Sequence, residues 1–334
     1  MIEFKNYLQR LISNEPLSEQ DMHAGFKLMV SAPKAQQAAF LSLLSARGET
    51  VEELVGLLKF LKEQAIIIKP KMDLIDIVGT GGDGLKTFNI STASSLVVAS
   101  QGVKVAKHGG RAITSYSGST DVLEHLRIPL YDSAERILHQ LKKYHFSYLC
   151  APLFNPVLRA LAPLRRELGM ATFINILGPL ANPTHVKRQV IGVYRTDLLP
   201  KIIQVLKATG SIHSLVVRSS EGMDEFSVSS PTTVMHLQNG VIREYSVSPE
   251  EIGLKTAPLE AVIGGTAEQN AKIIRDIFSG KLKGPCLDIV LFNAAAGFLV
   301  ADRVTSLQEG VELARKTIEA GNAHNLLNNL SGSQ

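Results

Sequence analysis

The sequence predicts an α/β protein with an entirely helical N-terminal part, and three observations predict this class. Apolar residues up to Pro70 recur at helical spacing. Between Asp73 and Leu126, a strand, a loop rich in glycine and hydroxyl residues, and a helix follow one another twice. From Gln189 onward, strands alternate with helices again, which is typical of a mostly parallel sheet flanked by helices. The length of 334 residues is enough for about two domains.

The composition is ordinary for a globular protein and argues against several other classes. Hydrophobic residues make up 45% and charged residues 20%, and the net charge of +4 includes no basic block. This charge mildly favours small anionic ligands and makes a nucleic-acid partner unlikely on physical grounds. Cys150 and Cys286 are too few for a disulfide framework or a zinc site. The N-terminus lacks a signal-peptide pattern and the uncharged run 289–301 is too short to span a bilayer, so we expect a cytoplasmic protein without a membrane partner.

Residues 1–70 contain start and stop signals for several helices. Ser18 followed by Asp21 resembles a capping box with Asp in place of Glu or Gln. Thr50-Val-Glu-Glu53 is a complete capping box at the start of a helix that ends before Pro70. No catalytic motif lies in this part, and we expect it to pack on a partner or on another domain.

The stretch from residue 73 to 111 contains the predicted ligand site. A strand at Leu74–Val78 breaks into Gly79-Thr-Gly-Gly-Asp-Gly84, and a helix is predicted at Ala93–Ser100. Glycine lets main-chain N–H groups approach a ligand closely, and the first N–H groups of a helix lack partners. Further side-chain donors come from Thr87, Asn89, Ser91 and Thr92. We interpret this end of the strand as a phosphate-binding loop, with a glycine-rich turn that binds nothing as the alternative.

Two better-known phosphate motifs do not fit this loop. Its glycines satisfy G-x-G-x-x-G, but no Asp or Glu occurs between Leu85 and Thr120 to contact a ribose. In a Walker A loop the lysine directly follows the last glycine, and here Leu85 intervenes. Asp83 would repel a phosphate unless a cation lay between them. Mg²⁺ binds one or two carboxylates together with substrate phosphates, so we expect Mg²⁺ as a cofactor.

A second polar loop follows the strand predicted at Val103–Ala106. Lys107 precedes His108-Gly-Gly110 and can supply positive charge where the main chain lies close to a ligand. Arg111 can do the same or can hold a nearby carboxylate, and His108 alone is a weak candidate. Hydroxyl residues continue from Thr114 through Ser115 to Ser119. Because the carboxyl ends of parallel strands meet at one edge of a sheet, the two loops should converge there.

The middle of the chain is rich in proline and arginine. Pro156 and Pro163 are expected to punctuate helices, and Gly178-Pro179 to form a turn. Arg165 and Arg166 point in different directions on a helix. One of them is a candidate for binding a planar carboxylate through two parallel hydrogen bonds, and the other for pairing with a surface acid. The residue pattern does not choose between them.

The remaining chain predicts further strands and helices around one acidic motif. Met223-Asp-Glu225 fits a divalent cation, although taken alone it is better explained as a charged surface turn. Asn239-Gly240 predicts a hairpin. The elements expected are strands at 190–194, 214–217, 233–237 and 241–245, and helices at 198–208, 266–278, 288–300 and 306–320. No H-E-x-x-H or G-x-S-x-G motif occurs, so displacement at an activated phosphorylated sugar is favoured over covalent catalysis.

Seven motifs in one order and spacing resemble the anthranilate phosphoribosyltransferase family, over nearly the full chain. They are Gly79-Thr-Gly-Gly-Asp-Gly84, Asn89-Ile-Ser-Thr92, Lys107-His-Gly-x-Arg111, Gly118-Ser-x-Asp-Val-Leu-Glu124, Arg165-Arg-Glu-Leu-Gly169, Asn175-x-Leu-Gly-Pro-Leu-x-Asn-Pro183 and Met223-Asp-Glu225. The resemblance implies a small helical domain at 1–70, joined by part of 160–185, and a larger α/β domain at 73–160 and 186–334. It also implies a homodimer formed through the helical domains, and transfer of phosphoribose from phosphoribosyl pyrophosphate (PRPP) to the amine of anthranilate in tryptophan biosynthesis.

The resemblance also implies roles for individual residues. Contacts with PRPP are expected at Gly79, Gly82, Asp83, Thr87, Asn89, Ser91, Thr92, Lys107 and Ser119. Further substrate contacts are expected at Ile90, His108, Gly109, Gly110, Arg111 and Ser115. Gly79 and Arg165 are expected to contact anthranilate, with Arg165 holding its carboxylate. Mg²⁺ is expected on Ser91, Asp224 and Glu225, and the catalytic roles fall on Lys107 and Asp83.

Two positions on the acceptor side depart from the family pattern. Gly110 stands where the family usually has Asn, and Asn155 where it usually has His before a proline. Both are expected to line the path of anthranilate, and losing one hydrogen bond there costs about 0.5–1.5 kcal/mol. These departures motivate an alternative enzyme, a related phosphoribosyltransferase or nucleoside phosphorylase with another acceptor. A non-catalytic relative that binds nucleic acid is the alternative outside enzymes.

Overall fold

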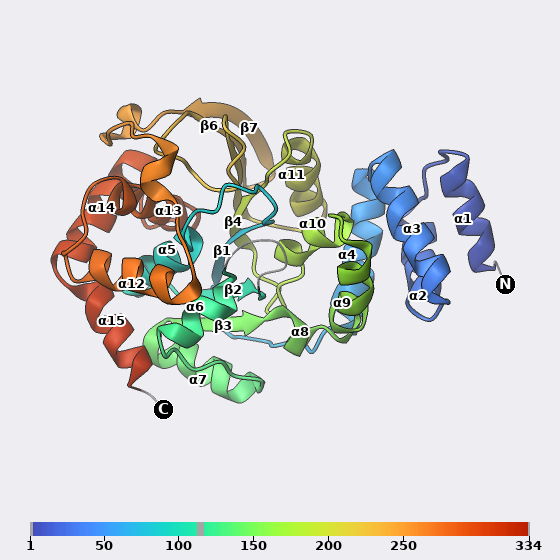
Figure 1. Ribbon diagram of the computed structural model, residues 1–334, viewed down its shortest axis with the longest axis horizontal. Helices are drawn as coiled ribbons and strands as arrows, with labels where there is room; N and C mark the ends of the chain where they lie inside the picture. Colours follow the sequence, from blue (N-terminus) through green and yellow to red (C-terminus); the bar gives the residue numbers. More distant parts are fainter. Residues whose placement is uncertain (1–2, 112–116, 333–334) are drawn as a thin grey trace.

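The structure is a computed structural model that describes residues 3–111 and 117–332. Within these ranges, a seven-stranded sheet lies at the centre of the larger part, and helices cover both of its faces. A group of helices that contains the N-terminus projects from one side (Figure 1). This arrangement confirms the predicted fold class of a helical part joined to an α/β part with a mostly parallel sheet. None of the described helices is long and apolar enough to cross a membrane.

The strands lie in the order β3-β2-β1-β4-β5-β6-β7. All pairs from β3 to β5 are parallel, and β6 and β7 are antiparallel to their neighbours. Asn239 and Gly240 both have positive φ, at 49° and 81°, and they form the predicted hairpin turn between β6 and β7. The strands are β1 Ile75–Gly79, β2 Val105–Gly109, β3 Phe146–Cys150, β4 Arg188–Gly192, β5 His213–Ser219, β6 Thr232–Gln238 and β7 Val241–Val247.

Successive residues of the central strands point into two different cores. Ile75 and Ile77 of β1 belong to the core beneath α5 (Ile90–Ala99) and α13 (Pro285–Val300). Val78 belongs to a second core, which it shares with α11 (Leu198–Ala208) and the N-terminal helices. Strands buried on both faces read as continuous apolar runs, which is why a short apolar run predicted β1. Asp76 is a charged residue in the middle of this buried strand.

The helices around the sheet bury their apolar sides against it. α13 is buried at every residue from Ile289 to Val300. A Cβ added at Gly297 would lie 2.6 Å from Ile77 Cδ1, so this helix packs directly on β1. The elements around the sheet are α5 Ile90–Ala99, α6 Ser119–His125, α7 Ala134–Tyr144, α8 Ala151–Phe154, α11 Leu198–Ala208, α12 Ala267–Phe278, α13 Pro285–Val300, α14 Leu307–Glu319 and α15 Asn322–Ser331, with 3₁₀ turns η1 Glu250–Ile252 and η2 Leu259–Val262.

The N-terminal helices share one core with two helices from the middle of the chain. Phe26 packs edge-on against Phe173 at 5.9 Å between ring centroids, and Phe40 packs against both rings. Thr50 and Glu53 form the predicted capping box of α4, and Ser18 accepts from the Asp21 N–H at the start of α2. The helices of this group are α1 Phe4–Ile12, α2 Glu19–Val30, α3 Lys34–Arg47, α4 Val51–Gln64, α9 Pro156–Leu168 and α10 Phe173–Leu180.

Two proline predictions were wrong. Pro163 lies inside α9, and Pro179 lies inside α10 with Gly178, where a turn was expected. A proline inside a helix removes one hydrogen bond and costs about 3 kcal/mol. Both helices bury apolar residues in the shared core, among them Leu161 and Leu177, and this tertiary packing overrides the local signal. β3, α7 and the final helix α15 were not predicted from the sequence.

Candidate active site

The glycine loop between β1 and α5 exposes main-chain N–H groups at the carboxyl edge of the sheet. Gly81, Gly82 and Gly84 have φ values of 66°, 90° and 72°, a region that favours glycine. α5 begins at Ile90 and its N-cap residue, Asn89, makes no side-chain capping bond. The Ile90 N–H donates to Phe88 O at 2.7 Å, which leaves the next N–H groups of the first turn, those of Ser91 and Thr92, for an anion.

Three carboxylates converge on this loop. Asp224 Oδ2 accepts from the Gly81 N–H at 2.6 Å. Burial, and then the charge of Asp83, raises the pKa of Asp224. Burial, and then the charge of Asp224, raises the pKa of Glu225, while Lys107 acts in the opposite direction. Besides burial, the negative charges of neighbouring carboxylates raise the pKa values of Asp224 and Glu225, so these groups repel one another.

Lys107 lies beside this acidic group. The Lys107 side chain is buried on β2, and its Nζ donates to Ile77 O at 2.6 Å and to Ser91 Oγ at 3.1 Å. Burial lowers the pKa of Lys107, whereas Asp76, Glu225 and Asp224 raise it. A buried ammonium next to carboxylates and a helix N-terminus can stabilise the negative charge of a bound phosphate group.

The two polar loops meet, as their positions after β1 and β2 predicted. Asn89 Nδ2 donates to Ser117 O at 3.3 Å, and Thr92 Oγ1 donates to Ser119 Oγ at 3.3 Å. Asn270 of α12, which the sequence analysis missed, donates to Asn89 Oδ1 at 2.9 Å. Thr87 pairs with residue 263, Ile90 is buried, and Gly109 and Gly110 end β2 and begin the second loop. Ser115 lies outside the described residues.

Arg111 is engaged by surface acids. Its guanidinium donates to Asp121 Oδ1 at 2.7 Å and to Glu124 Oε2 at 3.0 Å. These hydrogen bonds, to Glu124 first and then to Asp121, raise the pKa of Arg111. Arg111 was considered for binding a ligand or for holding a nearby carboxylate, and in the structure it holds two carboxylates.

Arg165 and Arg166 differ in their surroundings. Arg165 is half-buried and its Nη2 donates to Asn175 Oδ1 at 3.0 Å, whereas Arg166 is exposed. Burial lowers the pKa of Arg165, and among the described residues no carboxylate pairs with it. A half-buried guanidinium held by a neutral amide keeps its other donors for a planar anion.

Three further residues were expected on the acceptor side: Gly110 has free space beside it, whereas His108 and Asn155 are buried and hydrogen-bonded within the protein. A Cβ added at Gly110 would meet nothing within 4 Å. His108 Nδ1 donates to Gly178 O at 3.0 Å, and burial lowers the pKa of His108 to about 4, so the ring is neutral at pH 7. Asn155, expected to line the acceptor path, is instead buried. Its Nδ2 donates to Leu61 O at 3.1 Å and its Oδ1 accepts from Leu158 N at 3.1 Å.

The carboxylates and Ser91 fit a magnesium ion that brings further oxygen ligands with it. Among the described residues, no group of three or more His, Cys, Asp or Glu side chains is arranged to hold a metal ion. The carboxylates of Asp224 and Glu225 are hard oxygen donors with raised pKa values, which a divalent cation would lower. One or two carboxylates with substrate phosphates are a usual Mg²⁺ environment.

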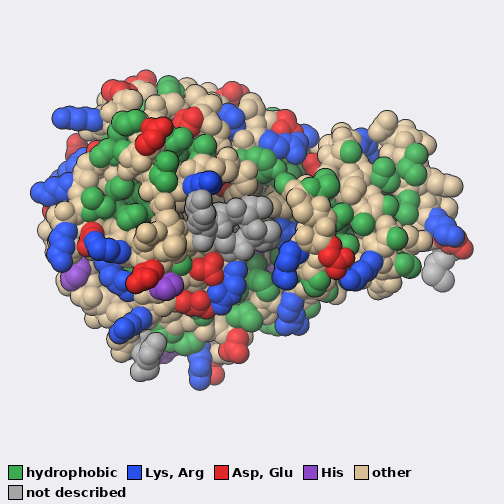
Figure 2. All heavy atoms as spheres, in the orientation of Figure 1, with side chains coloured by type: hydrophobic (Ala, Val, Ile, Leu, Met, Phe, Trp, Pro, Cys, Tyr) green, Lys and Arg blue, Asp and Glu red, His purple; other side chains and the backbone are tan. Residues whose placement is uncertain are grey.

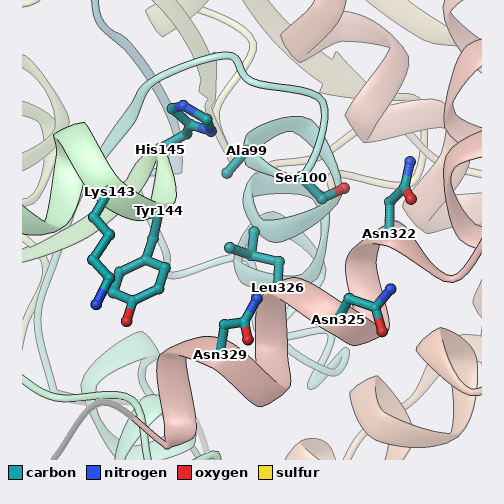
Figure 3. A pocket seen from close by; sticks show the side chains of 9 residues that line it. All are labelled: Ala99, Ser100, Lys143, Tyr144, His145, Asn322, Asn325, Leu326 and Asn329. Atoms are coloured by element: carbon teal, nitrogen blue, oxygen red, sulfur yellow. The ribbon is translucent and has the colours of Figure 1, made fainter.

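Two surface cavities lie elsewhere on the described chain. The first, of about 310 Å³, lies between α5, α7 and α15 and is lined by Asn322, Asn325 and Asn329 (Figure 3). The second, of about 520 Å³, lies between α12, α13 and α14. Neither includes a predicted site residue. Positive and negative side chains are mixed over the face seen in Figure 2, with no continuous basic surface there.

Comparisons with known proteins cover both the helical and the α/β part of the chain. Residues 71–324 match the model of the glycosyl transferase family a/b domain, and residues 5–65 match its helical bundle domain. An anthranilate phosphoribosyltransferase of Symbiobacterium thermophilum is 44% identical over 326 residues, covering 97% of this chain and 95% of that protein. The crystal structure of the Thermus thermophilus enzyme has a TM-score of 0.91 at 37% identity and covers 99% of this chain and 98% of that one.

A more distant structure carries ligands. The anthranilate phosphoribosyltransferase of Saccharomyces cerevisiae, solved in complex with PRPP and Mg, has a TM-score of 0.91 at 27% identity and covers 99% of this chain and 98% of that one. The family models and the relatives thus span both the helical and the α/β part of this chain. The chain belongs to the anthranilate phosphoribosyltransferase family.

Proposed function

We propose that this enzyme transfers the phosphoribosyl group of PRPP to the amine of anthranilate, a step of tryptophan biosynthesis. The products are N-(5-phosphoribosyl)anthranilate and pyrophosphate. One observation carries the proposal: the glycine loop, the acidic pair and Lys107 come from different strands and meet at one edge of the sheet. This edge offers N–H donors, an ammonium and metal-binding carboxylates to a single polyphosphate ligand.

The donor half binds PRPP through main-chain and side-chain groups. The N–H groups of the glycine loop and of the start of α5 bind phosphate oxygens, and Asn89, Thr92 and Ser119 add polar groups. Ser91, Asp224 and Glu225 hold Mg²⁺, which when bound neutralises charge on the pyrophosphate. Asp83 lies next to this acidic group. Lys107 is placed to stabilise the departing pyrophosphate, and the buried site makes its charge more effective.

The acceptor half binds anthranilate. Arg165 holds the carboxylate, and Asn175 fixes the orientation of the guanidinium. The amine attacks the anomeric carbon from the face opposite the pyrophosphate, the bond from that carbon to the pyrophosphate oxygen breaks, and the nitrogen then loses a proton to water. We expect an oxocarbenium-like transition state, so catalysis depends on positioning and electrostatics.

The test is the loss of anthranilate fluorescence with PRPP and Mg²⁺. Consumption that requires both supports the proposal. PRPP binding without consumption favours a related phosphoribosyltransferase or nucleoside phosphorylase, an alternative motivated by the open space at Gly110. A salt-sensitive gel shift without turnover would favour a nucleic-acid-binding relative, which the mixed charges in Figure 2 do not support.

We also propose a cytoplasmic homodimer in which the helical domain makes the contact. This domain comprises 1–70 with part of 160–185, and 73–160 with 186–334 form the α/β domain. Ile12 and Leu28 on α1 and α2 are 65% and 39% exposed, which supports an apolar contact with a second copy. Light scattering should give twice the mass of one chain, and a monomer at micromolar concentration would contradict it.

A further inference from the structure

The strands β1 and β2 separate toward the site. β1 pairs with β4, and β2 with β3, over five residues each. Between β1 and β2 only Ile75 and Val105 are in register. Beyond this pair, side chains take the place of hydrogen bonds between the two strands. Asn182 Nδ2 donates to Ala106 O at 2.8 Å, and His108 N donates to Asp76 Oδ1 at 3.2 Å. Lys107 Nζ donates to Ile77 O at 2.6 Å.

Asp76 and Asn182 form a buried and fully bonded pair at this opening. Their relative exposures are 0% and 1%. Asn182 Nδ2 donates to Asp76 Oδ2 at 2.9 Å as well as to Ala106 O, which uses both of its hydrogens. Asn182 Oδ1 accepts from Thr184 N at 3.0 Å and from Thr184 Oγ1 at 2.7 Å. The pair therefore ties β1, β2 and the segment between α10 and β4 to one another.

The segments that Asp76 and Asn182 connect include His108 of β2, a residue on the acceptor side of the site. The main chain of His108 is held by Asp76, and its ring is held by Gly178 of α10. Gln189 Nε2 also donates to Pro179 O at 3.1 Å, which fixes the end of α10 to β4. Because the Nδ1 hydrogen is used by Gly178, His108 Nε2 is an acceptor. It is buried, and no described residue bonds it.

Packing of the core does not require a carboxylate at position 76. The other residues of β1 up to Val78 are apolar, and an apolar side chain at position 76 would avoid the cost of burying a charge. The carboxylate does supply acceptors that hold β2 and the α10–β4 segment at one separation. Asp76 reaches the acceptor side through His108 and Asn182, and its charge also raises the pKa of Lys107.

We propose that Asp76 is a positioning residue for the acceptor half of the site. Together with Asn182 it keeps the carboxyl ends of β1 and β2 apart and sets the place of His108 and Gly178 relative to Lys107. The inference rests on the proposed function, since it names anthranilate as the ligand that depends on this geometry.

Two variants test the role, with one matched control. In Asp76→Asn the new Nδ2 faces Asn182 Nδ2, donor against donor, although Oδ1 can still accept from His108 N. Asn182→Ala keeps the Asp76 charge near Lys107 and removes the tie to the α10–β4 segment. We expect each to raise the KM for anthranilate about tenfold, from loss of charge-assisted hydrogen bonds. The Kd for PRPP with Mg²⁺, measured by calorimetry, should change much less in Asn182→Ala, which leaves the Asp76 charge beside Lys107.

The control is Ser147→Ala on β3. Ser147 Oγ donates to Gln140 at 2.8 Å in a buried pair between β3 and α7, so this variant also loses one buried side-chain bond. It should leave both the KM and the Kd unchanged. A lower Tm in all three variants with an unchanged anthranilate KM would show a merely structural role and overturn the proposal.

Asn182→Ala decides the test if Asp76→Asn does not fold, and the wild-type activity separates this proposal from the proposed function. If Asp76→Asn does not fold, an unchanged anthranilate KM in Asn182→Ala overturns the proposal, and a raised KM with an unchanged Kd for PRPP supports it. A wild type that binds PRPP but does not consume anthranilate counts against the proposed function, and the acceptor role of Asp76 falls with it. Wild-type turnover with unaltered variants overturns the positioning role alone.

Discussion

Asp224 accepts a hydrogen bond from the Gly81 N–H at 2.6 Å, which joins the acidic pair after β5 to the loop after β1. β4 lies between these two strands, so the acidic segment crosses the end of β4 to reach the loop. Gly192 ends β4 and leaves room for this crossing, since a Cβ there would lie 1.5 Å from Asp224 O. The position of Asp224, a proposed Mg²⁺ ligand, therefore depends on the absence of a side chain at Gly192.

Gly192→Ala should displace the acidic segment. The new methyl group meets main chain, which cannot rotate away, and overpacking of this kind typically costs about 1–3 kcal/mol. We expect a lower Tm and a higher Mg²⁺ requirement for turnover. Gly110→Ala is the control for stability, because a Cβ there meets nothing within 4 Å. An unchanged Mg²⁺ requirement in a folded Gly192→Ala would contradict this account of the crossing.

Lys107→Ala should reduce turnover by about 10²–10³, the usual effect of removing one electrostatic stabiliser of a transition state. The reason is the loss of the ammonium that lies among the carboxylates of Asp76, Asp224 and Glu225 and bonds Ser91 at the start of α5. Initial rates at saturating PRPP and anthranilate measure the effect. Lys104→Ala is the matched control, since Lys104 lies outside the buried cluster, and it should retain wild-type turnover. Rates near wild type for Lys107→Ala would remove its proposed role.

Arg165→Ala and Arg166→Ala should differ in the KM for anthranilate. Arg165 is half-buried with one neutral partner, and hydrogen bonds to a charged group contribute about 1.5–3 kcal/mol, which corresponds to a rise of about tenfold or more. Arg166 is exposed and should leave the KM unchanged. Steady-state kinetics with anthranilate varied at saturating PRPP separates the two. Equal effects of both substitutions would mean that the carboxylate is held elsewhere.

Local signals predicted the donor side better than the acceptor side. The run Leu74–Val78 and its glycines predicted β1 and the loop, because a buried strand and a glycine turn are encoded by adjacent residues. The arginine pair could not be resolved, since burial distinguishes Arg165 from Arg166 and burial depends on the tertiary packing of α9. The prediction for α5 began at Ala93, whereas the helix begins at Ile90. Its polar first turn resembles a loop in sequence.

The Asp76–Asn182 pair shows what local patterns cannot reveal. The two residues are 106 positions apart, and no spacing rule connects them. A usable signal did exist, because Asp76 interrupts an apolar run with a charge. A charged residue inside a strand predicted to be buried on both faces requires a partner. β3 was missed for a different reason: a helix ending in basic residues and His145 in the left-handed conformation lead directly into it, without glycine or proline.

Acid should destabilise the protein through two stacked histidines far from the site. His213 Nε2 and His236 Nε2 are 2.9 Å apart, and His213 Nδ1 bonds Asp302 at 2.7 Å. Burial, then His213 and Arg243, lowers the pKa of His236 to about 4 from 6.5. A depressed pKa contributes stability that is present above 6.5 and is lost as pH falls toward 4.

The Tm of the wild type should therefore fall between pH 7 and pH 4.5, and the fall should be smaller in His236→Gln. His139, an exposed residue of α7, is the control position, and His139→Gln should follow the wild type. Equal slopes of Tm against pH in all three proteins would show that the histidine pair does not contribute to acid sensitivity.

Gly110→Asn should lower the KM for anthranilate. Asn is the residue of the family pattern at this position, and a Cβ added here meets no described atom within 4 Å, so the start of a side chain is accommodated. One added hydrogen bond contributes about 0.5–1.5 kcal/mol, which corresponds to a decrease in KM of about two- to tenfold. Gly110→Ala adds bulk without the amide and should not lower the KM. A fall in the Asn variant alone assigns the gain to hydrogen bonding, and equal KM values in the two variants and the wild type would show that the site does not use an amide at this position.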